Sequence, residues 1–233
     1  MQRINSSSVR SVLLLSCLVF AAVSKADEVC ETEDYSDCPS PQGWYVGAKL
    51  GFSDTDVSNQ QLLNAYRNAG LNVSSADADT SDIYQGIELG YQFNPYLALQ
   101  LAYQDWGERY VKFSGETFDE EEYFDIAEHI YPDTARGPSV DLLLSYPLSQ
   151  RWRVTGKLAW FKWKRDYTTF NFRQERGNDD IRGTDTILAL GVDYRFSENW
   201  VLNFSIEQAK LEQYDVRNFM IGVRYFFTQS SDE

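Results

Sequence analysis

The chain has 233 residues, enough for one sizeable domain, and carries 35 acidic against 21 basic side chains, for a formal net charge of −14. A chain this acidic, without a long basic block, lacks the positive surface that attracts phosphate backbones, so the composition excludes a nucleic-acid-binding protein. Aromatic residues make up 15% of the chain, and its only long apolar run lies at the N-terminus.

Residues 1–26 have the pattern of a secretory signal peptide. Two arginines precede the apolar stretch Val12–Val23, and Ser24-Lys25-Ala26 offers small residues at the positions that a signal peptidase reads. Leu14-Leu15-Ser16-Cys17 also fits a lipoprotein cleavage box, but the apolar stretch continues past Cys17, which favours ordinary cleavage after Ala26. Export removes three basic residues and no acid, so the mature chain is more acidic still.

Residues 27–42 form an acidic segment rich in Pro and Ser, which we expect on the periplasmic side. Its two cysteines, Cys30 and Cys38, would meet an oxidising compartment, where a disulfide between them is the simplest expectation. A metal site is disfavoured because two thiolates without a nearby His do not complete a tetrahedral shell. The sequence suggests no cofactor.

From residue 43 onward the sequence alternates with a period of two. Between Gly43 and Ser53 the even positions are apolar, whereas the odd positions are mostly small or polar. Similar alternation returns in seven further segments, at residues 83–93, 97–104, 139–146, 152–160, 188–196, 200–207 and 219–227. Each apolar side continues for about the ten residues that a tilted strand needs to cross a bilayer.

The connections between these segments alternate in length. Three are short turns, at residues 94–95, 147–151 and 197–199, and three are long, at roughly 54–81, 107–136 and 166–183. Short turns on one rim and long loops on the other are typical of outer-membrane barrels. The sequence therefore predicts an all-β, eight-stranded antiparallel up-and-down transmembrane β-barrel over residues 43–227 in the outer membrane, followed by a tail at 228–233.

A soluble sandwich or small ligand-binding barrel would also alternate. It would hide the apolar side in a core and show charge outside, whereas here the charges share their side with glycines, as in a crowded lumen. Aromatic residues bracket the short turns and the two barrel ends, which predicts a girdle at the membrane interface. Its expected members are Trp44, Phe93, Tyr96, Tyr146, Trp152, Phe196, Trp200 and Phe227.

Charged residues of the inward side nearly neutralise one another. They comprise Lys49, Glu88, Asp141, Arg153, Lys157, Asp193, Arg195, Glu207 and Arg224. Because an unpaired charge in a closed lumen is costly and an eight-stranded barrel is only just wide enough for its own side chains, we expect a paired network. Lys49 with Glu88, and Lys157 with Asp193, are the expected facing pairs. A narrow channel lined by these residues is the alternative.

Five motifs together resemble the OmpA-like transmembrane domain of Gram-negative bacteria. They are Gly43-Trp44-Tyr45-Val46-Gly47-Ala48-Lys49-Leu50-Gly51, Asn94-Pro95-Tyr96, Ser145-Tyr146-Pro147-Leu148, Leu190-Gly191-Val192-Asp193-Tyr194 and Ile221-Gly222-Val223-Arg224-Tyr225-Phe226-Phe227. The resemblance implies an inward charge cluster that plugs the lumen, with Glu88, Lys157 and Asp193 at matching positions. Two basic positions of the family appear here as Leu143 and Asn203. This chain stops six residues after Phe227, so the wall-tethering role of the further OmpA domain is not transferred.

The second long loop gathers acidic side chains between residues 116 and 133, interleaved with aromatic and aliphatic ones. Such a run is either a solvated surface or a patch that collects divalent cations between lipopolysaccharide phosphates or meets an extracellular partner. Residues 77–82 resemble part of a calcium loop but lack its glycine and closing glutamate. In the first long loop, Leu62, Leu63 and Tyr66 form a short helical stripe, which we interpret as local loop packing.

A lipid-modifying enzyme is the rival class of small outer-membrane barrel. Catalysis of that kind uses a histidine beside a serine or an acidic partner, and the only histidine, His129, has no serine within four residues. We therefore predict no catalytic residues and a non-enzymatic, monomeric barrel in outer-membrane lipid and lipopolysaccharide. Its expected role is envelope integrity or surface interaction through long loops, with a narrow porin-like channel as the alternative.

Overall fold

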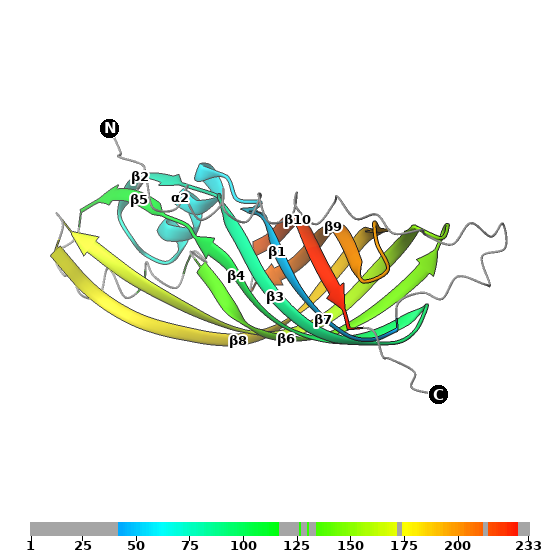
Figure 1. Ribbon diagram of the computed structural model, residues 1–233. Helices are drawn as coiled ribbons and strands as arrows, with labels where there is room; N and C mark the ends of the chain where they lie inside the picture. Colours follow the sequence, from blue (N-terminus) through cyan, green and yellow to red (C-terminus); the bar gives the residue numbers. More distant parts are fainter. Residues whose placement is uncertain are drawn as a thin grey trace, which may run out of the picture.

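The computed structural model describes residues 42–116, 126, 130, 134–171, 174–211 and 214–227. Within them the chain closes into a barrel whose neighbouring strands are all antiparallel. Around the barrel the order is β1 (Gly43–Thr55), β10 (Tyr214–Phe226), β9 (Trp200–Leu211), β8 (Gln174–Arg195), β7 (Trp152–Asn171), β6 (Thr134–Pro147), β4 (Leu97–Glu108) and β3 (Ser81–Asn94), which pairs with β1 again. Figure 1 shows this closure with β1 and β10 side by side. The predicted eight-stranded up-and-down barrel is confirmed.

Because the sequence alternates with a period of two, successive side chains lie alternately on the outer face and on the lumen face of the barrel. On β1, Leu50 is 37% exposed whereas its neighbour Lys49 is only 6% exposed. The same contrast separates the exposed Leu190 from the buried Asp193 on β8. Since successive side chains of a strand point to opposite faces, one face of the whole barrel is apolar and the lumen receives the other side.

The short turns all lie on one rim, where β1 begins and β10 ends. Backbone hydrogen bonds tighten them, as between the Leu148 amide and the Trp152 carbonyl at 2.8 Å. At the closure of the barrel the Phe227 amide donates to the Trp44 carbonyl at 2.9 Å. In an outer-membrane barrel this is the periplasmic rim, and the other rim is extracellular.

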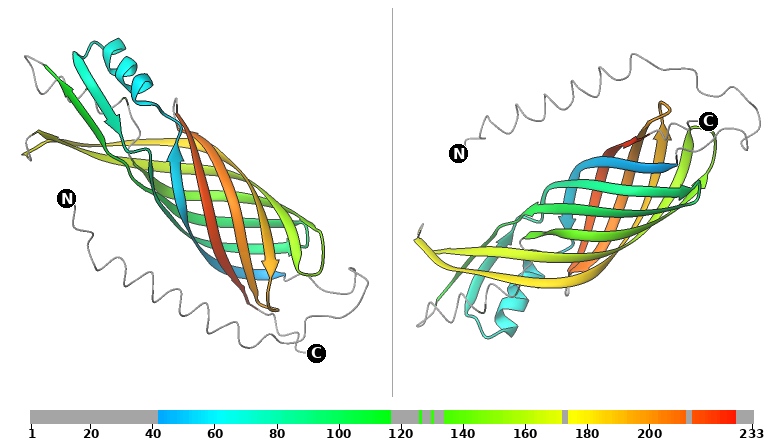
Figure 2. Two further views of the ribbon diagram at one scale, coloured as in Figure 1. Left: turned by 90° about the horizontal axis from the view of Figure 1, so that it is seen from above. Right: turned by 60° about the horizontal axis from the view of Figure 1, so that its bottom comes forward.

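One prediction about the long connections is wrong. The segment at 166–183 is not an irregular loop, because β7 and β8 continue through it as a paired hairpin as far as Asn171 opposite Gln174. Figure 2 shows the two strands reaching past the rest of the rim. A ribbon outside the membrane needs no apolar side, so this part of the sequence loses the alternation that marks the strands within lipid.

Described parts of the first two long connections form a small cap, comprising α2 (Asn59–Asn68), β2 (Val73–Ala78) and β5 (Val111–Gly115). Ser58 and Gln61 begin the helix with a capping box. Leu62 and Tyr66 are buried against the antiparallel pair of β2 and β5, as the helical stripe in the sequence predicted. Figure 2 shows the cap beyond the barrel rim. No helix among the described residues is long and apolar enough to cross a membrane.

The cap has a hydrophobic core of its own, which a single substitution can test. Leu62 is fully buried there, so Leu62→Ala should destabilise the cap by about 2–5 kcal/mol while the barrel keeps its stability. Hydrogen exchange of α2 and β2 measures the first effect, and the denaturant midpoint of the refolded barrel measures the second. Asn64→Ala, at an exposed position of the same helix, is the control. Equal exchange in the two variants would contradict an independent cap core.

Candidate functional site in the barrel lumen

The inward charges meet in the middle of the lumen. Glu88 bridges two bases, with Lys49 Nζ at 2.9 Å from its Oε2 and Arg224 Nε at 2.5 Å from its Oε1. Arg224 in turn reaches Asp193, with Nη1 at 3.1 Å from Oδ2. The strand register explains the first contact, because Glu88 lies opposite Gly47 and therefore diagonal to Lys49. The structure thus contains the expected pair of Lys49 with Glu88, extended by Arg224.

The second expected pair is wrong. Asp193 does not contact Lys157 but pairs with Arg153, whose Nε lies 2.7 Å from its Oδ2, because the register places these two residues directly opposite. Lys157 lies about 13 Å further along β7, four residues at about 3.3 Å each. It forms an ion pair with Glu207 and lies 3.7 Å from the Asp141 carboxylate.

The network is balanced and buried. Lys49, Arg153, Lys157 and Arg224 face Glu88, Asp141, Asp193 and Glu207, and each of these eight residues is at most 9% exposed. Neutral side chains complete the contacts, as Gln100 Nε2 donates to Asp141 at 2.7 Å and Asn203 Nδ2 to Asp193 at 2.5 Å. Arg195, the ninth predicted member, lies half-buried nearer the periplasmic mouth. Such partners offset the buried charges, although Asp141 Oδ1 and Glu207 Oε2 are buried without a hydrogen-bond partner.

Leu143 stands where the family resemblance implied a base, and it belongs to a periplasmic apolar cluster. This cluster consists of Tyr45, Ala98, Leu143, Val201 and Phe226. The Tyr45 and Phe226 rings lie 4.9 Å apart, and the Tyr45 hydroxyl donates to Gln100 at 3.0 Å. Gly90 makes room for the Tyr45 ring, since a Cβ at Gly90 would lie 2.2 Å from it. One side of the network is therefore covered toward the periplasmic rim.

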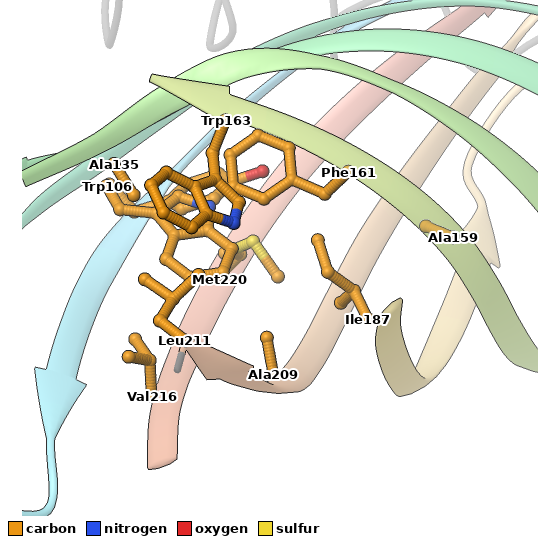
Figure 3. Packing of buried hydrophobic residues seen from close by; sticks show 11 residues of the cluster. Trp106, Ala135, Ala159, Phe161, Trp163, Ile187, Ala209, Leu211, Val216 and Met220 are labelled. Atoms are coloured by element: carbon orange, nitrogen blue, oxygen red, sulfur yellow. The ribbon is translucent and has the colours of Figure 1, made fainter. Parts of the chain in front are cut away.

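A larger apolar layer lies in the extracellular half of the lumen, beside the buried polar side chains of Gln104 and Arg165. This upper apolar layer comprises Tyr84, Trp106, Ala135, Ala159, Phe161, Trp163, Ile187, Ala209, Leu211, Val216 and Met220. Seven of the eight barrel strands contribute to it, so it extends across the lumen. Figure 3 shows the Trp106 and Trp163 rings beside Phe161, and the Trp106 and Phe161 rings are stacked at 4.9 Å.

The upper apolar layer was missed by the sequence analysis. The expected strands 97–104 and 152–160 ended before its largest members, because the outward positions there become polar, as at Asp105, Lys162 and Lys164, while the inward positions become apolar. A signal was present, since Trp106, Phe161 and Trp163 continue the inward parity of their strands. Glycine also marks the site, because a Cβ at Gly183 would lie 2.3 Å from the Trp163 ring.

The predicted girdle residues gather at the periplasmic rim. Trp44, Phe93, Tyr96, Tyr146, Trp152 and Phe227 are exposed, and Phe196 and Trp200 are partly buried. Three tyrosines that the prediction omitted, Tyr91, Tyr194 and Tyr225, link these rings through centroid distances of 4.6 to 5.4 Å. Their position on the lipid interface stays a prediction that rests on this arrangement.

Several predicted features lie outside the described residues. These are the signal peptide, the segment 27–42 with Cys30 and Cys38, the tail at 228–233, His129 and most of the acidic second loop. Among the described residues, no three His, Cys, Asp or Glu side chains are grouped so that they could hold a metal ion.

A closed antiparallel barrel with an apolar outer face, short turns on one rim and charges inside defines an outer-membrane β-barrel protein. Comparison with known proteins agrees: a family model described as "Outer membrane protein beta-barrel domain" matches residues 13–227. The chain belongs to this family, and its barrel is of the OmpA-like type.

The similarity to relatives and to a solved structure covers the barrel. Outer membrane protein A of Serratia marcescens is 28% identical over 166 residues, which cover 70% of this chain and 41% of the relative. The Escherichia coli O157:H7 protein of the same name is 24% identical over 82% of this chain and 49% of its own. The chain thus spans about half or less of these relatives. The crystal structure of Neisserial surface protein A shares the fold, with TM-score 0.50, 11% identity, and coverage of 79% and 97% of the two chains.

Proposed function

We propose that this outer-membrane protein is a non-enzymatic barrel that contributes to envelope integrity or surface interaction by presenting its extracellular segments on a closed, membrane-anchored support. The observation that carries this proposal is the upper apolar layer, which extends across the lumen above a balanced charge network. A lumen packed in this way resembles the core of a protein rather than a conducting channel. The cap and the extended hairpin of β7 and β8 are the structured surfaces that such a support presents.

The alternative is a narrow porin-like channel. An ion moving along the lumen would have to separate the Glu88 and Arg224 pair and then pass the buried rings of Trp106 and Phe161. Each step removes charge from its partners or from solvent, which costs several kcal/mol per ion in a dry interior. The closed lumen therefore supports the anchoring role over conduction.

Conductance of the refolded protein in planar bilayers tests this proposal. A closed lumen should give rare and small steps at neutral pH, with no dependence of step size on which monovalent cation is present. A steady single-channel conductance in the parent protein would favour the channel instead. Boiled and unboiled samples should migrate differently in gels, which verifies folding before each record.

The absence of catalysis is a separate prediction. Because His129 has no serine within four residues, His129→Ala should leave the lipid composition of the outer membrane unchanged. Mass spectrometry of lipid A and phospholipids, from cells that produce the parent or the variant, measures this. A lipid species that disappears with this substitution, and returns with the parent protein, would establish an enzyme.

The location in the outer membrane suggests which partners the protein has. We propose contact with lipopolysaccharide, either directly or through divalent cations held by the acidic second loop, and surface contacts through the cap. We also retain the proposed division into signal peptide 1–26, acidic periplasmic segment 27–42 with a Cys30–Cys38 disulfide, barrel 43–227 and tail 228–233. Non-reducing mass spectrometry of the exported protein tests the disulfide, and two free thiols there would refute it.

A further inference from the structure

A row of basic side chains crosses the outer face of β6, β7 and β8 at the extracellular end of the apolar band. The register places Arg136 opposite Lys164, and Lys164 opposite Arg182. Lys162 lies two residues before Lys164 on β7 and therefore on the same outer face. Lys164 is partly buried, and the other three side chains are exposed. These four bases, from three neighbouring strands, are called the basic row below.

The basic row lies where the outer face changes from apolar to polar. On β7 the outward residue before Lys162 is Trp160, whose side chain is 51% exposed. On β8 the outward residues that follow Leu188 toward the extracellular side are Thr186 and Thr184, and both are exposed. Thr184 lies directly opposite Lys162. Because the apolar band of an outer-membrane barrel faces lipid tails, this change places Lys162 at the level of the lipid headgroups.

Lys162 differs from the rest of the basic row in its contacts. Arg136, Lys164 and Arg182 each have a further interaction within the protein. Within the described parts of the chain, the Lys162 ammonium forms neither a hydrogen bond nor an ion pair. Lys162 can therefore bind a group from the membrane without breaking a contact of the protein.

Other bases on the outer face near the extracellular rim lie opposite acids. Arg217 of β10 lies opposite Asp54 of β1, and Lys210 of β9 lies opposite Asp215 of β10. A neighbouring carboxylate competes with any other anion for such a base. Lys162, by contrast, has the neutral Thr184 opposite it. The position on β7 is therefore the more favourable one for an anion from outside the protein.

We propose that Lys162 binds a phosphate group of an outer-leaflet glycolipid, with the Thr184 hydroxyl as a second donor. An ammonium forms short, charge-assisted hydrogen bonds with phosphate oxygens. A phosphorylated lipid fits better than free phosphate, because Lys162 directly follows Trp160 on the face that lipid covers. The proposal rests on the lipopolysaccharide contact proposed above and names residues for its direct form. Since the ammonium itself neutralises the phosphate, this contact should persist without divalent cations.

Binding of lipid A to the refolded full mature chain in detergent tests the proposal. Native mass spectrometry in the presence of EDTA measures the affinity for lipid A that carries two phosphates. Lys162→Gln should lower this affinity about fivefold, the contribution of one basic residue at an anionic membrane surface. Lys162→Arg should restore most of it. Because Lys162 is exposed, these variants should fold, and the shift in gel migration on boiling verifies this.

Controls separate this contact from general charge and from the lipid tails. Lys210→Gln removes an exposed base of the same outer face and should leave the affinity nearly unchanged. Thr184→Val keeps the size of the side chain and should weaken binding by a smaller factor than Lys162→Gln. Dephosphorylated lipid A should bind the parent and Lys162→Gln equally, and more weakly than lipid A binds the parent. Millimolar inorganic phosphate should not displace lipid A.

Equal affinity of the parent and Lys162→Gln for lipid A would overturn the proposal. Equal losses in Lys162→Gln and Lys210→Gln would also do so, because they would indicate a general effect of charge. Displacement by inorganic phosphate would make the free anion the ligand instead of a lipid. Any of these results would leave the closed barrel standing, which conductance tests separately. Steady conductance in a parent that still binds lipid A through Lys162 would remove the closed barrel and keep this site.

Discussion

Replacing Glu88 by Ala should lower the free energy of unfolding by about 3–5 kcal/mol, the range for breaking a buried ion pair by removing one partner. The effect is large because one carboxylate serves two bases, Lys49 at 2.9 Å and Arg224 at 2.5 Å, and all three side chains are buried. A urea titration of the refolded barrel, followed by tryptophan fluorescence, measures the change.

Two matched variants serve as comparisons for that result. Glu198→Ala removes an exposed carboxylate from a periplasmic turn and should change the unfolding free energy by less than about 0.5 kcal/mol. Glu88→Gln keeps the size of the side chain and removes its charge, so its effect should approach that of Glu88→Ala if charge dominates. If all three variants unfold at the same urea concentration, Glu88 contributes no more than an exposed carboxylate. Water would then screen the network, contrary to the buried network described here.

Removing the two stacked rings of the upper apolar layer should have the second large effect. Trp106→Ala combined with Phe161→Ala should destabilise the barrel by more than the about 3–5 kcal/mol typical of one buried aromatic ring. It should also increase the frequency of conductance steps in planar bilayers, because these fully buried, stacked rings occupy part of the extracellular half of the lumen.

The control lies one residue away on the same strand. Trp160 is 51% exposed and faces outward, so Trp160→Ala removes a large ring without opening the lumen. We expect this variant to conduct as rarely as the parent. If the double variant conducts no more often than Trp160→Ala, the charge network alone closes the barrel.

Much of this fold could be predicted from the sequence because lipid imposes a simple rule on it. Every outward side chain within the membrane must be apolar, and therefore the strands, their direction and their inward residues are visible as alternation. The rule ends at the membrane boundary, which is why the hairpin extension at 166–183 was mistaken for a loop. The cap was only partly visible, through the stripe of Leu62, Leu63 and Tyr66.

The partners of inward charges were harder to predict than their identity. Parity shows that Lys157 and Asp193 both point inward, but only the register between strands decides which charges meet. Asp193 lies opposite Arg153 and pairs with it. Lys157 pairs instead with Glu207 of β9, a strand that is not adjacent to β7. Contacts across a lumen depend on strand tilt and on side-chain length, and a single sequence contains neither directly.

Pairing of β1 with β10 has a consequence for biogenesis. The strand pairing that closes the barrel places Tyr45 opposite Phe226. These two neighbouring strands are separated in the sequence by nearly the whole length of the barrel. Until β10 is available, β1 presents an open edge whose amides and carbonyls lipid cannot satisfy. Insertion into the membrane must therefore follow export of the whole chain, and a truncation that removes β10 should leave the remaining strands outside the bilayer and prone to aggregate.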